Sequence, residues 1–273
     1  MSLKLKGRLV LVGAGKMGGA MLEGWLRAGL APDRVVIFDP QPPSEIASVI
    51  DRHGILRNPP VTSVTDAEIV LVAVKPQIID DVLPMVAPLK ASKPLILSVA
   101  AGKTIATFER YFGKDAAVIR SIPNTPAAVG RGITAMAANA NVSPQQLAQA
   151  KSLLSAVGEV VTVPEESQID AVTAVSGSGP AYIFYLTECL AAAGAKMGLA
   201  PDLAMQLARA TVAGAGELMR VTGTDAATLR QNVTSPKGTT YAALQVLMAD
   251  DGLPRLMDEA IDAATKRSRE LAS

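Results

Sequence analysis

"RLVLVGAGKMGGAM", residues 8–21, places an apolar run directly before a glycine-rich turn and the start of a helix. The turn contains GAGKMG at 13–18, which is a G-x-G-x-x-G pattern. In such a turn the first glycine allows a tight bend, the second lets the backbone approach a pyrophosphate, and the third permits close packing of helix on strand. The phosphates then lie at a helix N-terminus, among N–H groups that have no partner within the helix. The stretch therefore predicts a dinucleotide-binding domain.

The chain after this turn alternates short apolar runs with segments of helical spacing. The runs are nearly continuous in apolar residues, as in strands that are covered on both faces of a parallel sheet. They lie at 8–13, 34–39, 68–74, 94–99 and 116–121, and two further runs at 132–138 and 159–163 extend the series. After about residue 164, Ala-rich helical segments replace them. We expect an α/β fold, with a Rossmann-type, doubly wound, mainly parallel sheet over 1–164 and an all-helical domain over 165–273.

The overall composition excludes several kinds of partner. The net charge is +1 and Lys and Arg form no cluster, which argues against nucleic acid or an anionic membrane as the main partner. Cys189 is the only cysteine, so no internal disulfide can form, and we expect a reducing, cytoplasmic setting without a signal peptide. The most apolar segment, 181–199, is interrupted by Glu188 and Lys196. It predicts a helix buried in the protein or in a subunit interface, not a membrane span.

The position of Asp39 bears on the choice between NADH and NADPH. It ends the second apolar run about twenty residues after the glycine turn, where an acidic residue usually accepts hydrogen bonds from the adenosine ribose. Its charge would repel a 2′-phosphate and favours NADH, although Arg34 and Lys75 could soften that repulsion. Alternatively, Asp39 only caps the turn that follows it.

Two further loops point toward the same cofactor. The segments AVKPQ at 73–77 and SVAAGKT at 98–104 follow the third and fourth long apolar runs. Ligands of open α/β sheets bind beyond the carboxyl ends of the strands, so both loops are expected at the cofactor. Lys75 could contact ribose or phosphate, or be a solvated lysine. The cofactor-binding residues expected from the turn and these loops are Gly13, Ala14, Gly15, Lys16, Met17, Gly18, Asp39, Ala73, Val74, Lys75, Pro76, Ala100, Ala101 and Gly102.

The inventory of reactive residues excludes several chemistries. His53 is the only histidine and lies far in sequence from these segments, which disfavours a His-dependent dehydrogenase or a triad hydrolase. With one His and one Cys, no zinc cluster of the usual make-up can form. The β-hydroxyacid dehydrogenases carry a Lys and an Asn one helical turn apart, where this chain has Ile183 and Thr187. The base that oxidises an alcohol is therefore missing.

Six stretches together give the chain a resemblance to the pyrroline-5-carboxylate reductases, the final enzymes of proline biosynthesis. They are GAGKMGGAM (13–21), AVKP (73–76), SVAAG (98–102), PNTPAAVG (123–130), DAVTAVSGSGPAY (170–182) and TSPKGTT (234–240). The resemblance covers nearly the whole chain. Two departures stand out: Lys16 replaces a frequent Asn, and Lys237 replaces a small residue that is usually Gly. Because Gly adopts positive φ freely, Lys237 would be strained or would force a different turn.

The resemblance implies reduction of the cyclic imine Δ1-pyrroline-5-carboxylate to L-proline with NADPH or NADH. It also implies a homodimer joined through the helical domains, which can assemble further into a decamer. A protonated imine accepts hydride far more readily than a carbonyl does, so the protein needs positioning and electrostatics more than a strong acid. Two alternatives remain open: a cofactor-binding protein that has lost catalysis, and a reductase of a related cyclic imine.

The resemblance also assigns roles within NVTSPKGTTYAAL, residues 232–244. Thr240 would form a hydrogen bond with the imine nitrogen, Ser235 would orient it, and Asn232 would reach the nicotinamide or its ribose. Each hydroxyl could equally be a helix cap.

The same segment would also bind the substrate carboxylate. The backbone N–H groups of Gly238, Thr239 and Thr240 would hold it at a helix N-terminus. The ammonium of Lys237 could sit beside that carboxylate or point into solvent. The other glycine-rich turn, SGSGPAY at 176–182, is expected to shape the packing between domains rather than to contact substrate.

Overall fold

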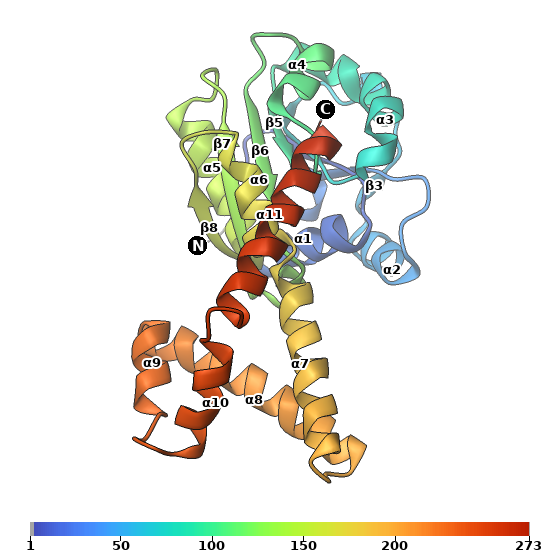
Figure 1. Cartoon of the computed structure of the whole chain (residues 1–273). Coiled ribbons are helices and arrows are strands. Elements are labelled where there is room, and N and C mark those ends of the chain that lie inside the picture. The colour runs from blue at the N-terminus through green and yellow to red at the C-terminus, as the bar shows by residue number, and fades with distance from the viewer. Residues whose placement is uncertain (1–2, 273) are drawn as a thin grey trace. The chain divides into compact units, whose positions relative to one another are not determined.

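The computed structural model describes residues 3–272 and divides into two compact units. The first unit comprises residues 1–177 together with 264–273, and the second comprises 178–263 (Figure 1). The expected boundary at 164/165 lies close to the end of the last strand, at Thr162, and not at the division between the two units. The two units are described separately below.

A mainly parallel sheet forms the centre of the first unit. Within residues 3–177 the sheet has eight strands in the order β3-β2-β1-β4-β5-β6-β7-β8. The strands are β1 (Arg8–Val12), β2 (Val35–Phe38), β3 (Leu56–Arg57), β4 (Ala67–Val72), β5 (Leu95–Ser98), β6 (Val118–Ile122), β7 (Gly132–Ala138) and β8 (Gly158–Thr162). Neighbouring strands are parallel except for the antiparallel pair β6 and β7. The order reverses between β1 and β4, which confirms the predicted Rossmann-type α/β fold.

Helices cover both faces of this sheet. They are α1 (Lys16–Arg27), α2 (Ser44–His53), α3 (Ile79–Val86), α4 (Ile105–Phe112), α5 (Pro144–Leu154) and α6 (Gln168–Val172), joined by the end of α11 (Leu253–Ala272). Alternate strand residues point to opposite faces. Leu9 and Leu11 of β1 therefore pack with α1, α2 and α5, whereas Val10 and Val12 pack with α3 and α4. The central strands β1, β4, β5 and β6 are buried on both sides, as their continuous apolar runs predicted, whereas the edge strand β3 and much of the edge strand β8 are exposed.

Local capping residues fix where several of these helices begin. Ser143 accepts a hydrogen bond from the N–H of Gln146, whose side chain accepts one from the N–H of Ser143, so a capping box starts α5. Thr104 caps α4 by accepting from the N–H of Thr107. Since Thr104 closes the loop SVAAGKT, this cap also fixes the end of that loop.

Within residues 178–263, the second unit consists of helices joined by short turns. It contains α7 (Gly179–Lys196), α8 (Pro201–Thr222), α9 (Ala226–Asn232), α10 (Thr239–Leu247) and the start of α11. Pro180 and Pro201 lie in the first turns of α7 and α8, where the fixed φ of proline suits the start of a helix. Gly223, with φ of 63°, ends α8, and Asp225 caps α9 by accepting from two backbone N–H groups. The switch from strands to helices predicted near residue 164 is confirmed.

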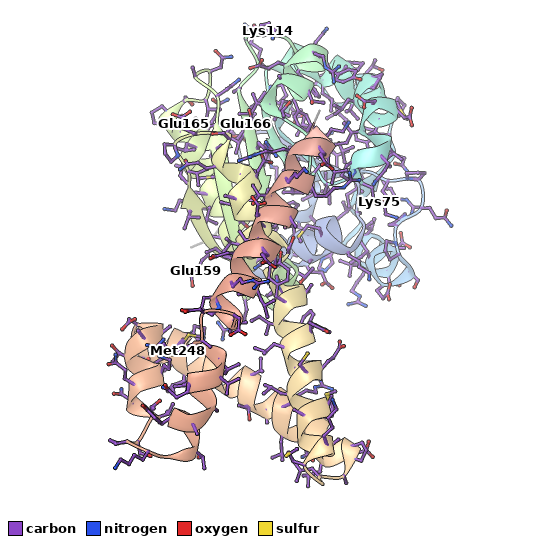
Figure 2. All side chains as sticks on the ribbon, viewed as in Figure 1. Lys75, Lys114, Glu159, Glu165, Glu166 and Met248 are labelled. Atoms are coloured by element: carbon purple, nitrogen blue, oxygen red, sulfur yellow. The ribbon has the colours of Figure 1, made fainter. Side chains whose placement is uncertain are left out.

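The second unit buries few large side chains within one chain. Its buried apolar cluster consists of Ala191, Ala204 and Ala208, where α7 meets α8. Phe184 and Tyr185 of α7 remain 62% and 67% exposed, and Met248 beyond α10 is also exposed (Figure 2). Such a large exposed apolar surface is typical of a protein interface. In the described part of the chain, no helix combines the length and apolar character needed to cross a bilayer.

Candidate active site

The three glycines of the GAGKMG turn have different surroundings in the first unit. Gly13 has φ of 90°, and a Cβ there would lie 2.7 Å from Cγ1 of Val74. A Cβ on Gly18 would overlap the carbonyl oxygen of Gly13, so this position needs glycine for packing. A Cβ on Gly15, in contrast, would meet no atom within 4 Å. Gly15 therefore faces open space at the N-terminus of α1, where a pyrophosphate is expected.

Asp39 contacts the glycine turn directly. The N–H of Ala14 donates to Oδ2 of Asp39 at 2.7 Å, and the N–H of Gln41 donates to Oδ1 at 2.8 Å. The carboxylate thus stabilises both the glycine turn and its own turn, which is the capping role considered from the sequence. Since each carboxylate oxygen accepts more than one hydrogen bond, a ribose contact is compatible with these bonds and stays a prediction.

The loops after β4 and β5 begin at the same edge of the sheet as the glycine turn. The N–H of Ala73 donates to the carbonyl of Val12 at 2.8 Å, and the N–H of Val99 donates to that of Val72 at 3.0 Å. Both loops therefore begin beyond the carboxyl ends of β1, β4 and β5, beside the position where the strand order reverses. Gly102 has φ of 69°, which favours glycine there. Lys75 is exposed (Figure 2).

An ion pair joins the segments that follow β4 and β5. Nζ of Lys103 lies 3.0 Å from Oδ2 of Asp80, and the hydroxyl of Tyr111 donates to Oδ1 at 3.0 Å. The hydrogen bonds from Lys103 and Tyr111 lower the pKa of Asp80, and the bond to Asp80 raises the pKa of Tyr111. Asp80 lies in the first turn of α3 and Lys103 in the loop before α4. This contact therefore ties the loop 98–104 to α3, the helix that follows the loop 73–77.

The turn between α9 and α10 in the second unit brings Ser235 against a helix N-terminus. The N–H of Gly238 donates to the carbonyl of Ser235 at 3.0 Å, which closes the turn. A Cβ on Gly238 would overlap Oγ of Ser235, so this hydroxyl lies directly against the N-cap of α10. Thr234 instead donates its hydroxyl to the carbonyl of Arg230 at 2.6 Å and caps α9.

The first turn of α10 offers backbone donors to an anion. Gly238 is its N-cap and provides no side-chain hydrogen bond to the helix. The first-turn N–H groups of a helix have no partner within the helix, and here they belong to Thr239 and Thr240. They carry the positive end of the helix dipole, which favours a carboxylate. Ser235, Gly238, Thr239 and Thr240 thus lie together, as the resemblance implied, while their contact with substrate stays a prediction.

Lys237 adopts the backbone conformation that glycine would favour. Its φ is 59°, so the turn is kept and the lysine bears the strain, which is the first of the two alternatives considered from the sequence. A non-glycine residue in this region costs about 1–2 kcal/mol. Glycine would remove that cost but lose more chain entropy on folding, about 0.5–1 kcal/mol relative to alanine.

We therefore expect Lys237→Gly to raise the free energy of unfolding by about 0.5–1 kcal/mol. Urea denaturation monitored by circular dichroism measures it. Lys237→Ala is the control, because it keeps the strain and should not stabilise the protein. A Lys237→Gly protein less stable than wild type would contradict a strained turn.

One buried polar group escapes prediction from the sequence. Arg120 lies in β6 and is 2% exposed, with Glu166 and Asp170 as partners. Its only local signal is a charged residue inside the apolar run AAVIRS at 116–121. The partners follow 46 and 50 residues later, so the sequence does not show the pairing.

The strand order, the glycine turn at the first strand–helix junction and the separate helical unit define a Rossmann-type, dinucleotide-dependent oxidoreductase. The family described as "NADP oxidoreductase coenzyme F420-dependent" matches residues 8–102, and "pyrroline-5-carboxylate reductase dimerisation" matches residues 166–271. Pyrroline-5-carboxylate reductases of Pseudomonas aeruginosa and Synechocystis sp. are 39% and 41% identical to this chain. Each match spans 97% of this chain, and the matches span 97% and 98% of the two relatives, respectively.

A solved structure extends this similarity to the whole fold. The pyrroline-5-carboxylate reductase of Coxiella burnetii is 33% identical and superimposes with a TM-score of 0.91 over 98% of this chain and 100% of that one. The enzyme of Plasmodium falciparum, solved with NADP bound, is 26% identical with a TM-score of 0.81, over 98% of this chain and 99% of that one. The chain belongs to the pyrroline-5-carboxylate reductase family, which confirms the resemblance given by its six motifs.

Proposed function

We propose that this chain reduces Δ1-pyrroline-5-carboxylate to L-proline with a nicotinamide dinucleotide, the last step of proline biosynthesis. Family membership supports the reaction, and the first turn of α10 is the observation that carries it. There, N–H donors lie next to the hydroxyls of Ser235 and Thr240, which matches a small ring bearing one carboxylate and one imine. The open approach at Gly15 supports a dinucleotide as the other ligand.

The proposed mechanism assigns binding and proton positioning to the protein. A bound dinucleotide would supply a hydride to the imine carbon, and the nitrogen would keep the proton that makes the imine an acceptor. The N–H groups of Thr239 and Thr240 hold the carboxylate, whereas the Gly238 N–H, which was expected to join them, donates to the carbonyl of Ser235 at 3.0 Å. The Thr240 hydroxyl forms a hydrogen bond with the imine nitrogen or relays its proton, Ser235 orients that hydroxyl, and Asn232 meets the nicotinamide or its ribose. Fixing the ring in this way lowers the entropy cost of reaction.

The residues around the glycine turn fit a dinucleotide. Gly13, Ala14, Gly15, Lys16, Met17 and Gly18 would surround the pyrophosphate, with Ala73 to Pro76 and Ala100 to Gly102 in the neighbouring loops. Gly13 and Gly18 are needed for packing within the protein, whereas at Gly15 only an approaching pyrophosphate would require glycine. Lys237, which is exposed, would add its charge beside the carboxylate or extend into solvent.

We expect a higher kcat/KM with NADH than with NADPH, because the Asp39 carboxylate would repel a 2′-phosphate at the ribose position. Steady-state kinetics with both cofactors measure the ratio. Asp39→Asn should lower the ratio of kcat/KM with NADH to kcat/KM with NADPH. Because Asp39 also accepts a hydrogen bond from the Ala14 N–H, the substitution affects both cofactors through the glycine turn, and only the change in this ratio reports the lost charge. A wild-type kcat/KM about tenfold higher with NADPH, worth about 1.4 kcal/mol, would refute the preference.

A second copy of the chain is the proposed partner of the helical unit. The exposed apolar residues of α7 and α8 include Phe184, Leu186 and Leu218, and the family model matched there is a dimerisation domain. Burying this face would give the unit the core that one chain lacks. Sedimentation equilibrium should show a dimer, or a decamer built from dimers; a monomer at micromolar concentration would count against the proposal.

A reductase of a related cyclic imine is the second candidate. The N-terminus of α10 recognises a carboxylate and would accept one on a larger ring. Turnover on five- and six-membered cyclic imine carboxylates separates the two functions, and we expect a higher kcat/KM with the five-membered ring. A higher value with the six-membered ring would favour the second candidate.

A further inference from the structure

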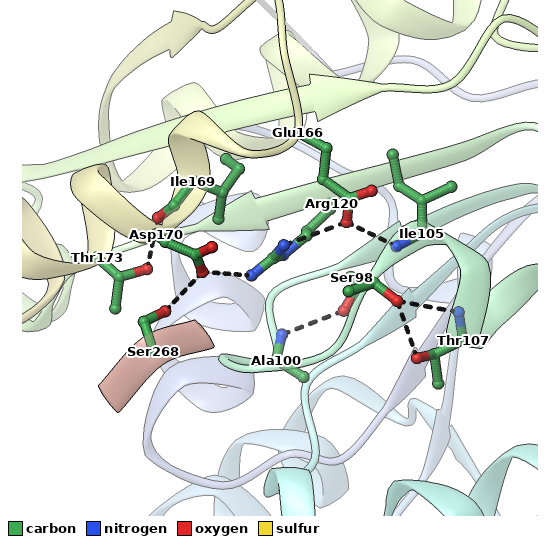
Figure 3. Close-up of polar contacts among 11 residues, drawn as sticks. Ser98, Ala100, Ile105, Thr107, Arg120, Glu166, Ile169, Asp170, Thr173 and Ser268 are labelled. Atoms are coloured by element: carbon green, nitrogen blue, oxygen red, sulfur yellow. Dashed lines mark hydrogen bonds and ion pairs between the residues drawn. The ribbon is translucent and has the colours of Figure 1, made fainter. Parts of the chain in front are cut away.

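A buried cluster in the first unit is centred on Arg120. Its Nη1 lies 3.1 Å from Oε1 of Glu166, and its Nη2 lies 3.5 Å from Oδ1 of Asp170 (Figure 3). Glu166 and its neighbour Glu165 belong to the segment between β8 and α6, and Asp170 belongs to α6 (Figure 2). Because a buried guanidinium needs charged partners, these ion pairs join α6 and the segment before it to β6.

The same two carboxylates reach beyond Arg120 to other elements. The hydroxyl of Ser268, in the part of α11 that belongs to the first unit, donates to Oδ1 of Asp170 at 2.7 Å (Figure 3). Oε1 of Glu166 accepts from the N–H of Ile105, the first residue of α4, at 2.8 Å. Arg120 therefore connects the last turns of α11 with the start of α4.

These contacts surround the loop SVAAGKT, residues 98–104. At its start, the hydroxyl of Ser121, next to Arg120 on β6, donates to the carbonyl of Ser98 at 2.8 Å. In its middle, a Cβ on Gly102 would lie 3.0 Å from Cβ of Leu271 and 3.1 Å from its carbonyl oxygen, so the loop backbone touches the last turn of α11. At its end, Glu166 holds Ile105.

We propose that Arg120, Asp170 and Ser268 are positioning residues that hold this loop in the conformation that binds the dinucleotide, with the last turn of α11 as its support. The end of the chain, distant in sequence from every cofactor motif, thus contributes to cofactor affinity. A loop fixed before binding does not lose conformational freedom on binding, so its affinity is higher. The identity of the ligand rests on the proposed function, whereas the hydrogen bonds are observed in the structure.

Ser268→Ala tests this proposal with a minimal change, because it removes one hydroxyl from a helix. We expect the Kd for NADH or NADPH, measured by fluorescence titration, to rise about fivefold, which is less than the full loss of one hydrogen bond to a charged group because Ser268 acts on the loop indirectly. The KM for the imine should stay within about twofold, since the substrate residues lie elsewhere. Ser268→Thr, which keeps the hydroxyl, should restore the Kd, and Ser152→Ala, at an exposed position of α5, is the matched control.

Hydrogen exchange without ligand provides a second readout. In Ser268→Ala we expect faster exchange in a peptide spanning 98–104 and unchanged exchange in one spanning 13–18. An unchanged Kd, equal loss of affinity in the Ala and Thr variants, or faster exchange throughout the protein would each overturn the proposal. A wild-type protein that binds no dinucleotide would instead refute the proposed function, so the two failures are distinguishable.

Discussion

Thr240→Ala is expected to lower kcat at least tenfold, which is less than the roughly 10²–10⁴-fold typical of a general acid because solvent can largely supply the proton of the imine. The hydroxyl of Thr240 is the group proposed to form a hydrogen bond with the imine nitrogen, and the chain's only histidine, His53, lies in α2, far in sequence from Thr240. Substrate binding should change less, because the Thr240 N–H that would hold the carboxylate survives the substitution. Steady-state kinetics at saturating cofactor separate kcat from KM.

Thr239→Ala is the matched control for this prediction. Thr239 is the neighbouring residue in the same helical turn, and only its backbone N–H has a proposed role. Its variant should keep a kcat within about twofold of wild type. Thr240→Ser should recover most of the activity because it keeps a hydroxyl. Equal losses for Thr239→Ala and Thr240→Ala would show that the helix start, not the Thr240 hydroxyl, is what matters.

Gly15→Val is expected to raise the Kd for the dinucleotide at least tenfold, or about 1.4 kcal/mol. The structure separates this effect from folding. A Cβ at Gly15 meets no atom within 4 Å, and the residue has an extended backbone with φ of −68°, not the positive φ that favours glycine. The side chain would fill only the space through which a pyrophosphate approaches. We therefore expect a Tm within a few degrees of wild type, measured by calorimetry without cofactor.

Gly18→Ala provides the contrast. Its added Cβ would overlap the carbonyl oxygen of Gly13, so both the Tm and the cofactor affinity should fall. If Gly15→Val bound the dinucleotide as tightly as wild type, the cofactor would not pass over this turn. The pair thus distinguishes a glycine that a ligand needs from a glycine that packing needs.

The sequence predicts the sheet well because its strands are buried on both faces. The run at 132–138 coincides with β7, and the other long runs differ from their strands by at most two residues at either end. β3 was not predicted, because Leu56 and Arg57 form a strand only by pairing with β2, and two residues carry no pattern of their own.

In the candidate site too, features formed by neighbouring residues could be predicted from the sequence, whereas contacts between residues far apart in the sequence could not. The glycine turn and the start of α10 are local motifs, so they are visible in the sequence. The bond from Ala14 to Asp39 spans 25 residues and the one from Ser268 to Asp170 spans 98. Only the fold shows that Ser268 of α11 faces a buried carboxylate. The positive φ of Lys237 likewise depends on the turn as a whole.

The central claim is that the chain uses a nicotinamide dinucleotide to reduce a five-membered cyclic imine carboxylate. The most direct test follows the absorbance of NADH, and separately of NADPH, with purified protein before and after addition of Δ1-pyrroline-5-carboxylate, and identifies the product. We expect oxidation of the cofactor only after the imine is added, with one L-proline formed per dinucleotide oxidised. No turnover at saturating imine with either cofactor would contradict the claim and favour a cofactor-binding protein without catalysis.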